Sequence, residues 1–285
     1  MALMIVLGAM LLGGVALTLW WGSTEYRPWA PTSAGDPSVG TVTRRYLRGT
    51  GVALVGGFWA GALVTGPAVR LIMRLLAVTA GDDAQGRITE ADEVVGAIEL
   101  DGTIGLYLFG GVLPGLLSGA IYVVLRTWLP RGRLGGLVFG ALHLVVAATR
   151  IDPLRPDNPD FDIVGPGWLS VATFALAALL HGMAVAAIAN RFSTWLPPTG
   201  SGAAARAKAV LPLVLPVLLL IPAVFLLVPL VIGLLVTVAA SQIAPVVRAA
   251  HSRGVLVGGR IVLAALALLL LPGAITDLGD IVSRS

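Results

Sequence analysis

The chain of 285 residues contains no cysteine and few charged residues. Without thiols it forms no disulfide, no thiolate nucleophile and no Cys-ligated zinc or iron–sulfur centre. Only 12% of its residues are charged, whereas soluble domains carry about 25%. The mean hydropathy is +0.92, and 57% of the residues are hydrophobic. This shortage of charge, together with long uncharged runs, predicts an integral membrane protein.

Lysine and recognised enzyme motifs are also scarce. Lys208 is the only lysine among 19 basic residues, and the basic residues lie in short segments between apolar runs. A membrane explains that arrangement better than a polynucleotide does, so we expect a lipid bilayer as partner and no nucleic acid. The chain contains no GxxxxGK[ST] phosphate loop, no HExxH zinc motif and no GxSxG nucleophile motif. The sequence therefore indicates no known class of enzyme.

Apolar runs long enough to cross a bilayer, about 20 residues each, recur along the chain. They predict an all-α integral membrane protein, a bundle of seven or eight transmembrane helices in one membrane domain over residues 1–285. The tract 209–244 is uncharged, and its prolines favour a hairpin of two short spans over one broken helix. The predicted spans are residues 3–21, 50–68, 103–125, 134–149, 168–189, 209–226, 227–244 and 258–275.

Residues 1–21 form the first apolar run. A secretory signal peptide carries a basic start and a small-residue cleavage site, and this run shows neither. We therefore expect an uncleaved first span that ends at the interfacial pair Trp20 and Trp21.

The charges are divided unevenly between the segments that connect the spans. With eight spans, one set holds 13 basic and 2 acidic residues: 22–49, 126–133, 190–208 and 245–260. The opposite set holds 6 basic and 13 acidic residues: 69–102, 150–166 and 276–285. Because Lys and Arg in short loops favour the cytoplasm, we predict the first set inside and both termini outside, in a bacterial cytoplasmic (inner) membrane. Seven spans would weaken this bias.

Two of the three histidines lie inside predicted spans. His143 and His181 are 9 and 8 residues from the inner ends of consecutive antiparallel spans, so we expect both imidazoles at nearly one depth. An ionisable group at that depth is a candidate functional site. Two facing imidazoles can ligate a haem or a metal ion, or relay a proton. An interhelical or backbone hydrogen bond is favoured instead, because the spans offer no carboxylate to complete a site.

Arg70 and Arg74 lie four residues apart, on one helical face at the outer end of the second span. Such a pair is suited to grip an anionic group. Ion pairs with the acidic segment that follows, which holds Glu90, Asp92 and Glu93, are favoured because an unpaired arginine near the bilayer core is costly.

The acidic segment GRITEADEVVG, residues 86–96, predicts a short helix. Thr89 and Asp92 give the [ST]-x-x-[DE] capping signature. Four apolar residues follow at helical spacing, namely Ala91, Val94, Val95 and Ile98. We expect an amphipathic outer helix around residues 89–100, with its carboxylates facing the two arginines. General acid–base catalysis is a minor alternative, since carboxylates on a helix surface are usually solvated or paired.

The segment RIDPLRPDNPDFDIVGPG, residues 150–167, is rich in aspartate and proline. Asp157, Asp160 and Asp162 offer oxygen ligands for Ca²⁺, but their spacing lacks the ligand set and the turn glycine of an EF-hand. A rigid cap over the outer mouth of the bundle, held by its prolines, is therefore favoured over a calcium site.

Several predicted spans carry glycines four residues apart, which let helix backbones approach closely. The sets are Gly57 and Gly61; Gly111, Gly115 and Gly119; and Gly136 and Gly140. Packing within one compact bundle is favoured over the face of a homo-oligomer, because most such motifs serve packing in general.

Three stretches are distinctive: RLIMR…GRITEADEVVGAIELDGTIG, RTWLP and RIDPLRPDNPDF. Together they resemble uncharacterised multi-pass membrane proteins of high-GC bacteria, over roughly residues 50 to 195. No activity is assigned to those proteins, so the resemblance implies a family and transfers no residue roles.

Three functions remain open from the sequence. A structural or accessory component of a membrane complex is favoured slightly, since the spans contain no Asp, Glu or Lys and no enzyme motif. One alternative is a transporter or channel for a small or anionic solute. The other is a haem- or metal-dependent redox protein centred on His143 and His181, the one case in which a cofactor is implied. Expected protein partners are other membrane proteins or a second copy of the chain.

Overall fold

The computed structural model describes residues 1–28, 38–195, 224–243 and 252–284. Within these ranges every regular element is a helix. Among the described residues, six helices are long and apolar enough to cross a membrane, and a shorter apolar helix spans Gly132–Ala148. The predicted all-helical class is therefore confirmed for the described chain, whereas most of the predicted span 209–226 lies outside it.

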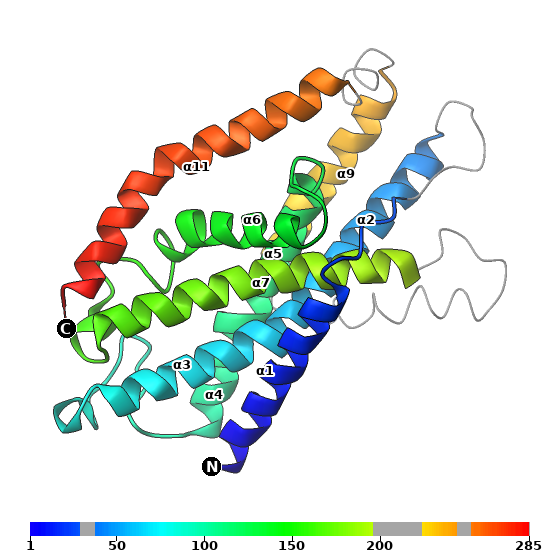
Figure 1. Ribbon diagram of the computed structural model, residues 1–285. Helices are drawn as coiled ribbons and strands as arrows, with labels where there is room; N and C mark the ends of the chain where they lie inside the picture. The colour runs from blue at the N-terminus through cyan, green and yellow to red at the C-terminus, as the bar shows by residue number, and fades with distance from the viewer. Residues whose placement is uncertain (29–37, 196–223, 244–251, 285) are drawn as a thin grey trace.

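The bundle is built around one long central helix (Figure 1). This helix consists of α2 (Val39–Ala60), η1 (Gly61–Thr65) and α3 (Gly66–Thr79), which follow one another without a break. Three further segments pack against it, namely α1 (Ala2–Trp21), the run of α4 (Leu100–Tyr107), η3 (Leu108–Val112) and α5 (Leu113–Leu125), and α7 (Gly167–Trp195). The pair of α6 (Gly132–His143) and η4 (Leu144–Ala148) packs against α7. The central helix extends well beyond both ends of the predicted span 50–68.

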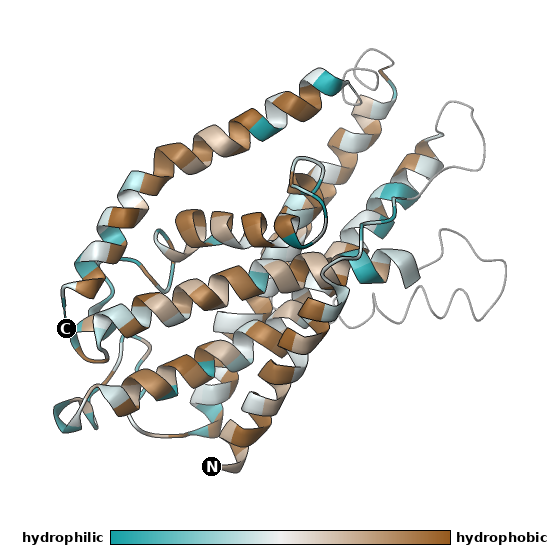
Figure 2. Cartoon of the chain, viewed as in Figure 1, coloured by the Kyte–Doolittle hydropathy of each residue, from teal (hydrophilic) through white to brown (hydrophobic). Residues whose placement is uncertain are grey.

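The remaining helices lie at the periphery. The short turn η6 (Val224–Leu226) leads into α9 (Leu227–Ser241), of which no residue is buried. In the 30-residue helix α11 (Arg253–Val282), only Ala274 and Ile281 are buried. Apolar side chains nevertheless dominate both helices (Figure 2). Nearly the whole circumference of each helix therefore faces outward with apolar side chains, as expected for contact with lipid or with another membrane helix.

Glycines let the central helices touch backbone to backbone. A Cβ built on Gly61 would lie 2.5 Å from the carbonyl oxygen of Gly111, and one built on Gly57 would overlap the carbonyl of Gly115. On the other side of the bundle, Gly140 leaves the same kind of space for α7 at Leu179. The prediction that these glycine motifs serve packing inside one bundle is confirmed.

Two prolines explain two π-helical turns in the interior. Pro67 and Pro114 each stand just after such a turn, η1 and η3 respectively. A proline has no N–H to donate and its ring crowds the preceding turn, which a locally widened helix relieves. The N–H of Gly66 accordingly bonds to Gly61, and the hydroxyl of Tyr107 donates to the carbonyl oxygen of Ala62. A tyrosine thus replaces the backbone donor that the widened turn removes.

The predicted outer helix around residues 89–100 is wrong, because this segment is a tight turn followed by extended chain. The Thr89 N–H donates to the Glu93 carbonyl (2.9 Å), the Asp92 N–H donates to the Thr89 carbonyl (3.0 Å), and an isolated antiparallel bridge joins Ile88 to Val94. Asp92 takes a left-handed backbone with φ of 59°, which is typical of the residue that closes a three-residue hairpin loop. The Thr89 hydroxyl accepts from the Glu93 N–H, so it serves this turn and not a helix cap.

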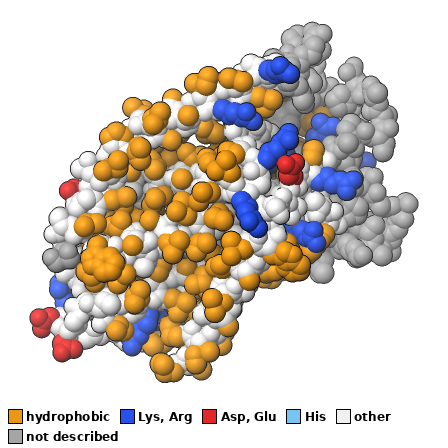
Figure 3. Space-filling view, in the orientation of Figure 1, with side chains coloured by type: hydrophobic (Ala, Val, Ile, Leu, Met, Phe, Trp, Pro, Cys, Tyr) orange, Lys and Arg blue, Asp and Glu red, His pale blue; other side chains and the backbone are white. Residues whose placement is uncertain are grey.

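The acidic and the basic segments gather at opposite ends of the bundle. The acidic end joins the 86–99 segment, the 150–166 loop and the end of α11 through Glu90, Arg155 and Arg284. At the basic end, Arg27 and Arg48 contact Ser193 at the end of α7. On the face drawn in Figure 3, blue side chains lie mainly at the upper right and most red ones at the lower left. Both chain ends lie toward the acidic end (Figure 1).

Candidate functional site

His143 and His181, the two histidines of the predicted spans, face each other as expected. His143 ends α6, His181 lies in the middle of α7, and their ring centroids are 5.5 Å apart at an interplanar angle of 71°. The helices approach closely because Gly136 and Gly140 on α6 pack against Gly182 on α7. Counting residues from the ends of the predicted spans therefore correctly brought the two rings to one level of the bundle.

Ser118 on α5 lies between the two rings and bonds to both. Its Oγ is 2.7 Å from Nε2 of His143 and 2.8 Å from Nε2 of His181. The outer nitrogens also have partners: His143 Nδ1 is 3.0 Å from the carbonyl oxygen of Phe139, and His181 Nδ1 is 2.6 Å from Oγ1 of Thr65. Four side chains from four helical segments thus form one network, which we call the histidine–serine network (Thr65, His181, Ser118 and His143).

With both rings neutral, the end contact of His143 gives one consistent set of directions for the hydrogen bonds of the network. A carbonyl oxygen only accepts, so Nδ1 of His143 carries the proton and Nε2 of the neutral ring accepts from Ser118. Because the single hydroxyl proton of Ser118 is donated to His143, the serine oxygen accepts a hydrogen bond from Nε2–H of His181. This leaves Nδ1 of His181 to accept from the Thr65 hydroxyl. Both imidazoles are neutral in this arrangement, and each of the four ring nitrogens is satisfied.

This geometry does not fit a haem or metal site. A ligated imidazole nitrogen needs a free lone pair directed at the metal, at about 2.0–2.1 Å for zinc. Here both Nε2 atoms are at hydrogen-bond distance from a serine hydroxyl, and both Nδ1 atoms are engaged as well. Among the described residues, no group of three or more His, Asp or Glu side chains is placed to hold a metal ion. The network is therefore an interhelical hydrogen-bond system.

Arg70 binds a threonine hydroxyl and a backbone carbonyl, and Arg74 binds a backbone carbonyl, rather than the predicted carboxylates. Nε of Arg70 donates to Oγ1 of Thr103 (3.0 Å) and Nη2 to the carbonyl of Ala97 (3.4 Å), while Nη1 of Arg74 donates to the carbonyl of Gly96 (2.9 Å). In the described chain neither arginine forms an ion pair with Glu90, Asp92 or Glu93, so that predicted pairing is wrong. The hairpin explains the difference, since it turns backbone carbonyls toward α3. The predicted latch to the second span exists, but carbonyl oxygens make it.

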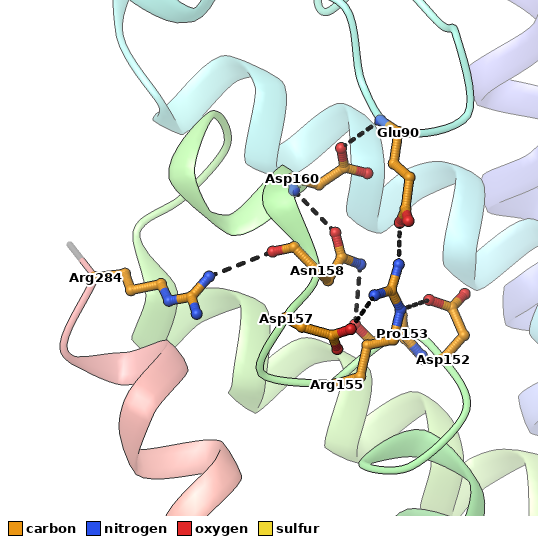
Figure 4. Close-up of polar contacts among 8 residues, drawn as sticks. All are labelled: Glu90, Asp152, Pro153, Arg155, Asp157, Asn158, Asp160 and Arg284. Atoms are coloured by element: carbon orange, nitrogen blue, oxygen red, sulfur yellow. Dashed lines mark hydrogen bonds and ion pairs between the residues drawn. The ribbon is translucent and has the colours of Figure 1, made fainter.

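Glu90 and the aspartates of the 150–167 loop have other partners. The Arg155 guanidinium lies among these carboxylates (Figure 4). It pairs with Glu90, with Asp157 (3.0 Å) and, at a longer distance, with Asp152 (3.9 Å). Oδ1 of Asp160 accepts from the Glu90 N–H at 2.7 Å. The loop therefore holds the 86–96 turn in place.

The end of α11 is fixed to the same loop. Arg284 donates to the carbonyl oxygens of Asn158 and Pro156 and lies 3.5 Å from Asp162 (Figure 4 shows the contact with Asn158). Each of the three aspartates considered as calcium ligands thus turns to a different donor: Asp157 to Arg155, Asp160 to a backbone N–H, and Asp162 to Arg284. They converge on no common point, which supports the cap interpretation over a calcium site.

Asp160 gives the cap a distinctive dependence on pH. Burial raises the pKa of this carboxyl, and the nearby Glu90 charge adds to the rise, while the bond from the Glu90 N–H and the Arg155 charge oppose it. A carboxyl whose pKa is higher in the folded than in the unfolded protein favours the folded state when it is protonated. This contribution to stability is fully present below the pKa of the unfolded state, about 3.8, and is lost as the pH rises through the pKa of the folded state.

We therefore expect wild type to gain stability relative to Asp160→Asn as pH falls from about 7 to about 4. The asparagine keeps an acceptor for the Glu90 N–H, so the comparison isolates the ionisation. Thermal unfolding of both proteins in detergent across this range measures the difference. Asp160→Ala, which also removes the acceptor, should be less stable at both ends of the range. A wild-type to Asn difference that does not change with pH would contradict the prediction.

Ser118 and Thr65 are the site residues that sequence reasoning missed. Hydroxyl side chains are neutral and common in membrane helices, so hydropathy does not mark them. One signal was present: Ser118 directly precedes Gly119 in a run of spaced glycines, on a part of α5 that approaches other helices closely. A hydroxyl there lies within reach of neighbouring helices as well as of its own backbone.

Comparison with protein-family models, curated proteins and solved structures finds no significant match to this chain. The functional argument therefore depends on the residues and contacts described above.

Proposed function

We propose that this chain is a multi-pass protein of a bacterial cytoplasmic membrane and acts as a structural or accessory component of a larger membrane complex. The proposal includes eight spans, with the acidic end and both termini outside. Its support is the charge division between connecting segments, the six apolar helices of spanning length and the gathering of the two sets of charges at opposite ends.

One observation supports the structural role. The candidate reactive groups are bound to partners within the chain, while the apolar side chains of α9 and α11 are exposed. Both intramembrane imidazoles, the two arginines of α3 and the loop aspartates are occupied by contacts within the chain. By contrast, α9 and α11 bury almost nothing. A chain with closed polar contacts and largely uncovered apolar helices is better suited to holding other membrane components than to chemistry.

Photo-crosslinking from α11 tests this role. A photoreactive residue at Leu269, whose side chain is 77% exposed, is expected to give a protein adduct of one discrete mass in native membranes. The same residue at Ile72, which is buried in the core, is the control and should give none. Native mass spectrometry should recover the same partner in a fixed ratio. Only monomer, with no protein adduct from Leu269, would contradict the proposal.

A separate experiment tests the orientation. Because the chain contains no cysteine, an introduced thiol is the only one that a maleimide can label. Asp157→Cys places a thiol at the acidic end and Arg131→Cys places one at the basic end, both at exposed positions. A membrane-impermeant maleimide applied to intact cells is expected to label the first variant. The second should react only after permeabilisation. Labelling in the reverse order would refute the proposed orientation.

Transport of a small or anionic solute is the second candidate, and the three π-helical turns favour it. They lie beside the polar groups of the interior: η1 contains Thr65, η3 follows Tyr107 and η4 follows His143. Such turns occur frequently at functional sites. Solute flux into liposomes that falls on Arg70→Ala or Arg74→Ala would support this candidate. Flux that is absent, or unchanged by both substitutions, would count against it.

A further inference from the structure

The histidine–serine network can accept one further proton at its Thr65 end. In the arrangement with two neutral rings all four ring nitrogens are engaged, so an incoming proton has to bind at a hydroxyl oxygen. Oγ1 of Thr65 keeps unused lone pairs, and its hydroxyl has a second acceptor in the carbonyl oxygen of Ala60, at 3.5 Å. Thr65 is half-buried, whereas Ser118 and His181 are buried. A proton therefore reaches the network most directly through Thr65.

Uptake of a proton at Thr65 reverses one hydrogen bond and breaks none. The Thr65 hydroxyl proton passes to Nδ1 of His181 over 2.6 Å, while Oγ1 takes a proton from hydronium, which leaves as water. The new hydroxyl proton turns to the Ala60 carbonyl, and Nδ1–H of His181 donates back to Oγ1. His181 then donates from both nitrogens, to Thr65 and to Ser118, as only a protonated ring can. No atom is oxidised or reduced, and the network gains one unit of charge.

Ser118 allows the added charge to move from one ring to the other. Nε2 of His181 gives its proton to Oγ of Ser118 over 2.8 Å, as Ser118 gives its own proton to Nε2 of His143 over 2.7 Å. His143 then donates to Ser118 and to the carbonyl oxygen of Phe139, and the Ser118 hydroxyl donates to His181. Every contact keeps one donor and one acceptor in both states, so the two imidazoles can share the added proton.

A second added proton does not fit this geometry. With both rings charged, both Nε2–H groups would point at the oxygen of Ser118, and the serine hydroxyl would lose both nitrogens as acceptors. Two positive charges on rings whose centroids are 5.5 Å apart would also repel each other at a site shielded from water. The geometry therefore limits the network to one added proton.

Other ionisable side chains of the described helices have partners outside the network. Among the described residues His143 is the only group whose charge acts on His181, and no charged side chain acts on His143. Helix α1, which packs against η1, carries no ionisable side chain. On the other packed segments the nearest ionisable groups contact different residues: Arg70 contacts Thr103 and Ala97, Tyr107 contacts Ala62, Tyr122 contacts Asn190, Arg150 contacts Asp277, and Arg191 contacts Trp195. The two imidazoles are therefore the groups at this level that can take up a proton.

We infer that the histidine–serine network is a binding site for one proton, which enters at Thr65 and is shared by the two histidines through Ser118. A buried charge is costly in a membrane, and hydrogen bonds that remain complete in each protonated state reduce that cost. The inference goes beyond the proposed function and does not depend on the accessory role, because all of these contacts lie within one chain.

The test follows both rings by nuclear magnetic resonance in the purified full chain, with isotopically labelled histidine and a neutral detergent. His251→Asn removes the third histidine, so that only two imidazoles contribute. As the pH is lowered while circular dichroism shows the fold intact, both rings are expected to change along one common curve. Their protonated fractions should add up to one. Fractions that add up to two, a change in one ring alone, or no change before the fold is lost would each overturn the inference.

Substitutions of Thr65 test its part in the site. Thr65→Val offers no acceptor to the charged ring and should weaken proton binding about tenfold, since a hydrogen bond to a charged group contributes more than one between neutral groups. Thr65→Ser keeps the hydroxyl and should bind the proton within about twofold of wild type. In the matched control, Thr173→Val, the lost hydroxyl donates only to the carbonyl oxygens of Leu169 and Ser170 in its own helix, so proton binding should not change.

The outcomes separate this site from a purely structural contact and from the accessory role. Equal weakening by the two valine substitutions, or none by Thr65→Val, would overturn the assignment of Thr65. The titration of the chain with an unaltered network stands even if Thr65→Val prevents folding. A chain that binds one shared proton but captures no protein partner would sustain this inference while removing the accessory role.

Discussion

Replacing Gly57 with alanine is expected to destabilise the bundle by about 3 kcal/mol, the upper part of the usual range for an overpacked core. The added methyl group would overlap the carbonyl oxygen of Gly115, which is backbone and cannot rotate away. Helices α2 and α5 would have to separate, and the neighbouring contact between Gly61 and Gly111 would open with them. The free energy of unfolding, from denaturant titration in detergent followed by circular dichroism, measures the effect.

Gly105→Ala provides the matched control. Gly105 also lies in a helix, α4, but a Cβ there would meet nothing within 4 Å. Alanine is favoured over glycine in a helix by up to about 1 kcal/mol, so this variant should match or exceed wild type in stability. Equal losses in the two variants would show that general glycine effects, and not the close approach of α2 to α5, determine stability.

Replacing Ser118 with alanine is expected to cost about 2–3 kcal/mol, the second largest effect. The substitution removes one oxygen and leaves a nitrogen on each imidazole without a partner. A buried unsatisfied polar group costs about 1–3 kcal/mol, while a single hydrogen bond between membrane helices averages about 0.6. The larger value applies because His181 is only 4% exposed, so water cannot replace the hydroxyl.

Ser170→Ala is the control for the loss of a buried serine hydroxyl. Ser170 is fully buried, but its Oγ donates only to the carbonyl oxygen of Pro166, the residue just before its own helix α7, at 3.4 Å. Its removal leaves no side chain of another helix unpaired, so the cost should stay below about 0.5 kcal/mol. A double-mutant cycle with His143→Phe should also show that Ser118→Ala costs less once one imidazole is gone. Additive costs would contradict a shared network.

The sequence predicted the parts of this fold that depend on hydropathy and spacing. Apolar length located the helices, spaced glycines indicated their close packing, and residue counts from the span ends placed His143 and His181 at one depth. These features follow from regular helix geometry, which a one-dimensional pattern records faithfully.

Features that depend on the third dimension were missed. The 89–100 segment carries a helix-like stripe and a capping signature, yet Asp92 adopts a left-handed backbone and the chain closes a hairpin. Arg70 and Arg74 were expected to pair with carboxylates, but they donate to the backbone carbonyl oxygens of Ala97 and Gly96 after the hairpin. Backbone acceptors are identical at every residue, so no sequence pattern reveals which of them a guanidinium will meet.

The acidic and basic residues that the structure describes at opposite ends of the bundle also form an electrical dipole along its axis. In the eight-span division of the sequence, which includes residues outside the described ranges, the connecting segments of the basic set carry a net +11 and those of the acidic set a net −7, a difference of 18 unit charges. Each unit charge moved across a potential of 100 mV costs about 2.3 kcal/mol, so in an energised membrane with a negative interior the two orientations differ by about 40 kcal/mol. In the proposed orientation, with the basic segments inside, membrane voltage alone would thus keep the inserted chain from inverting.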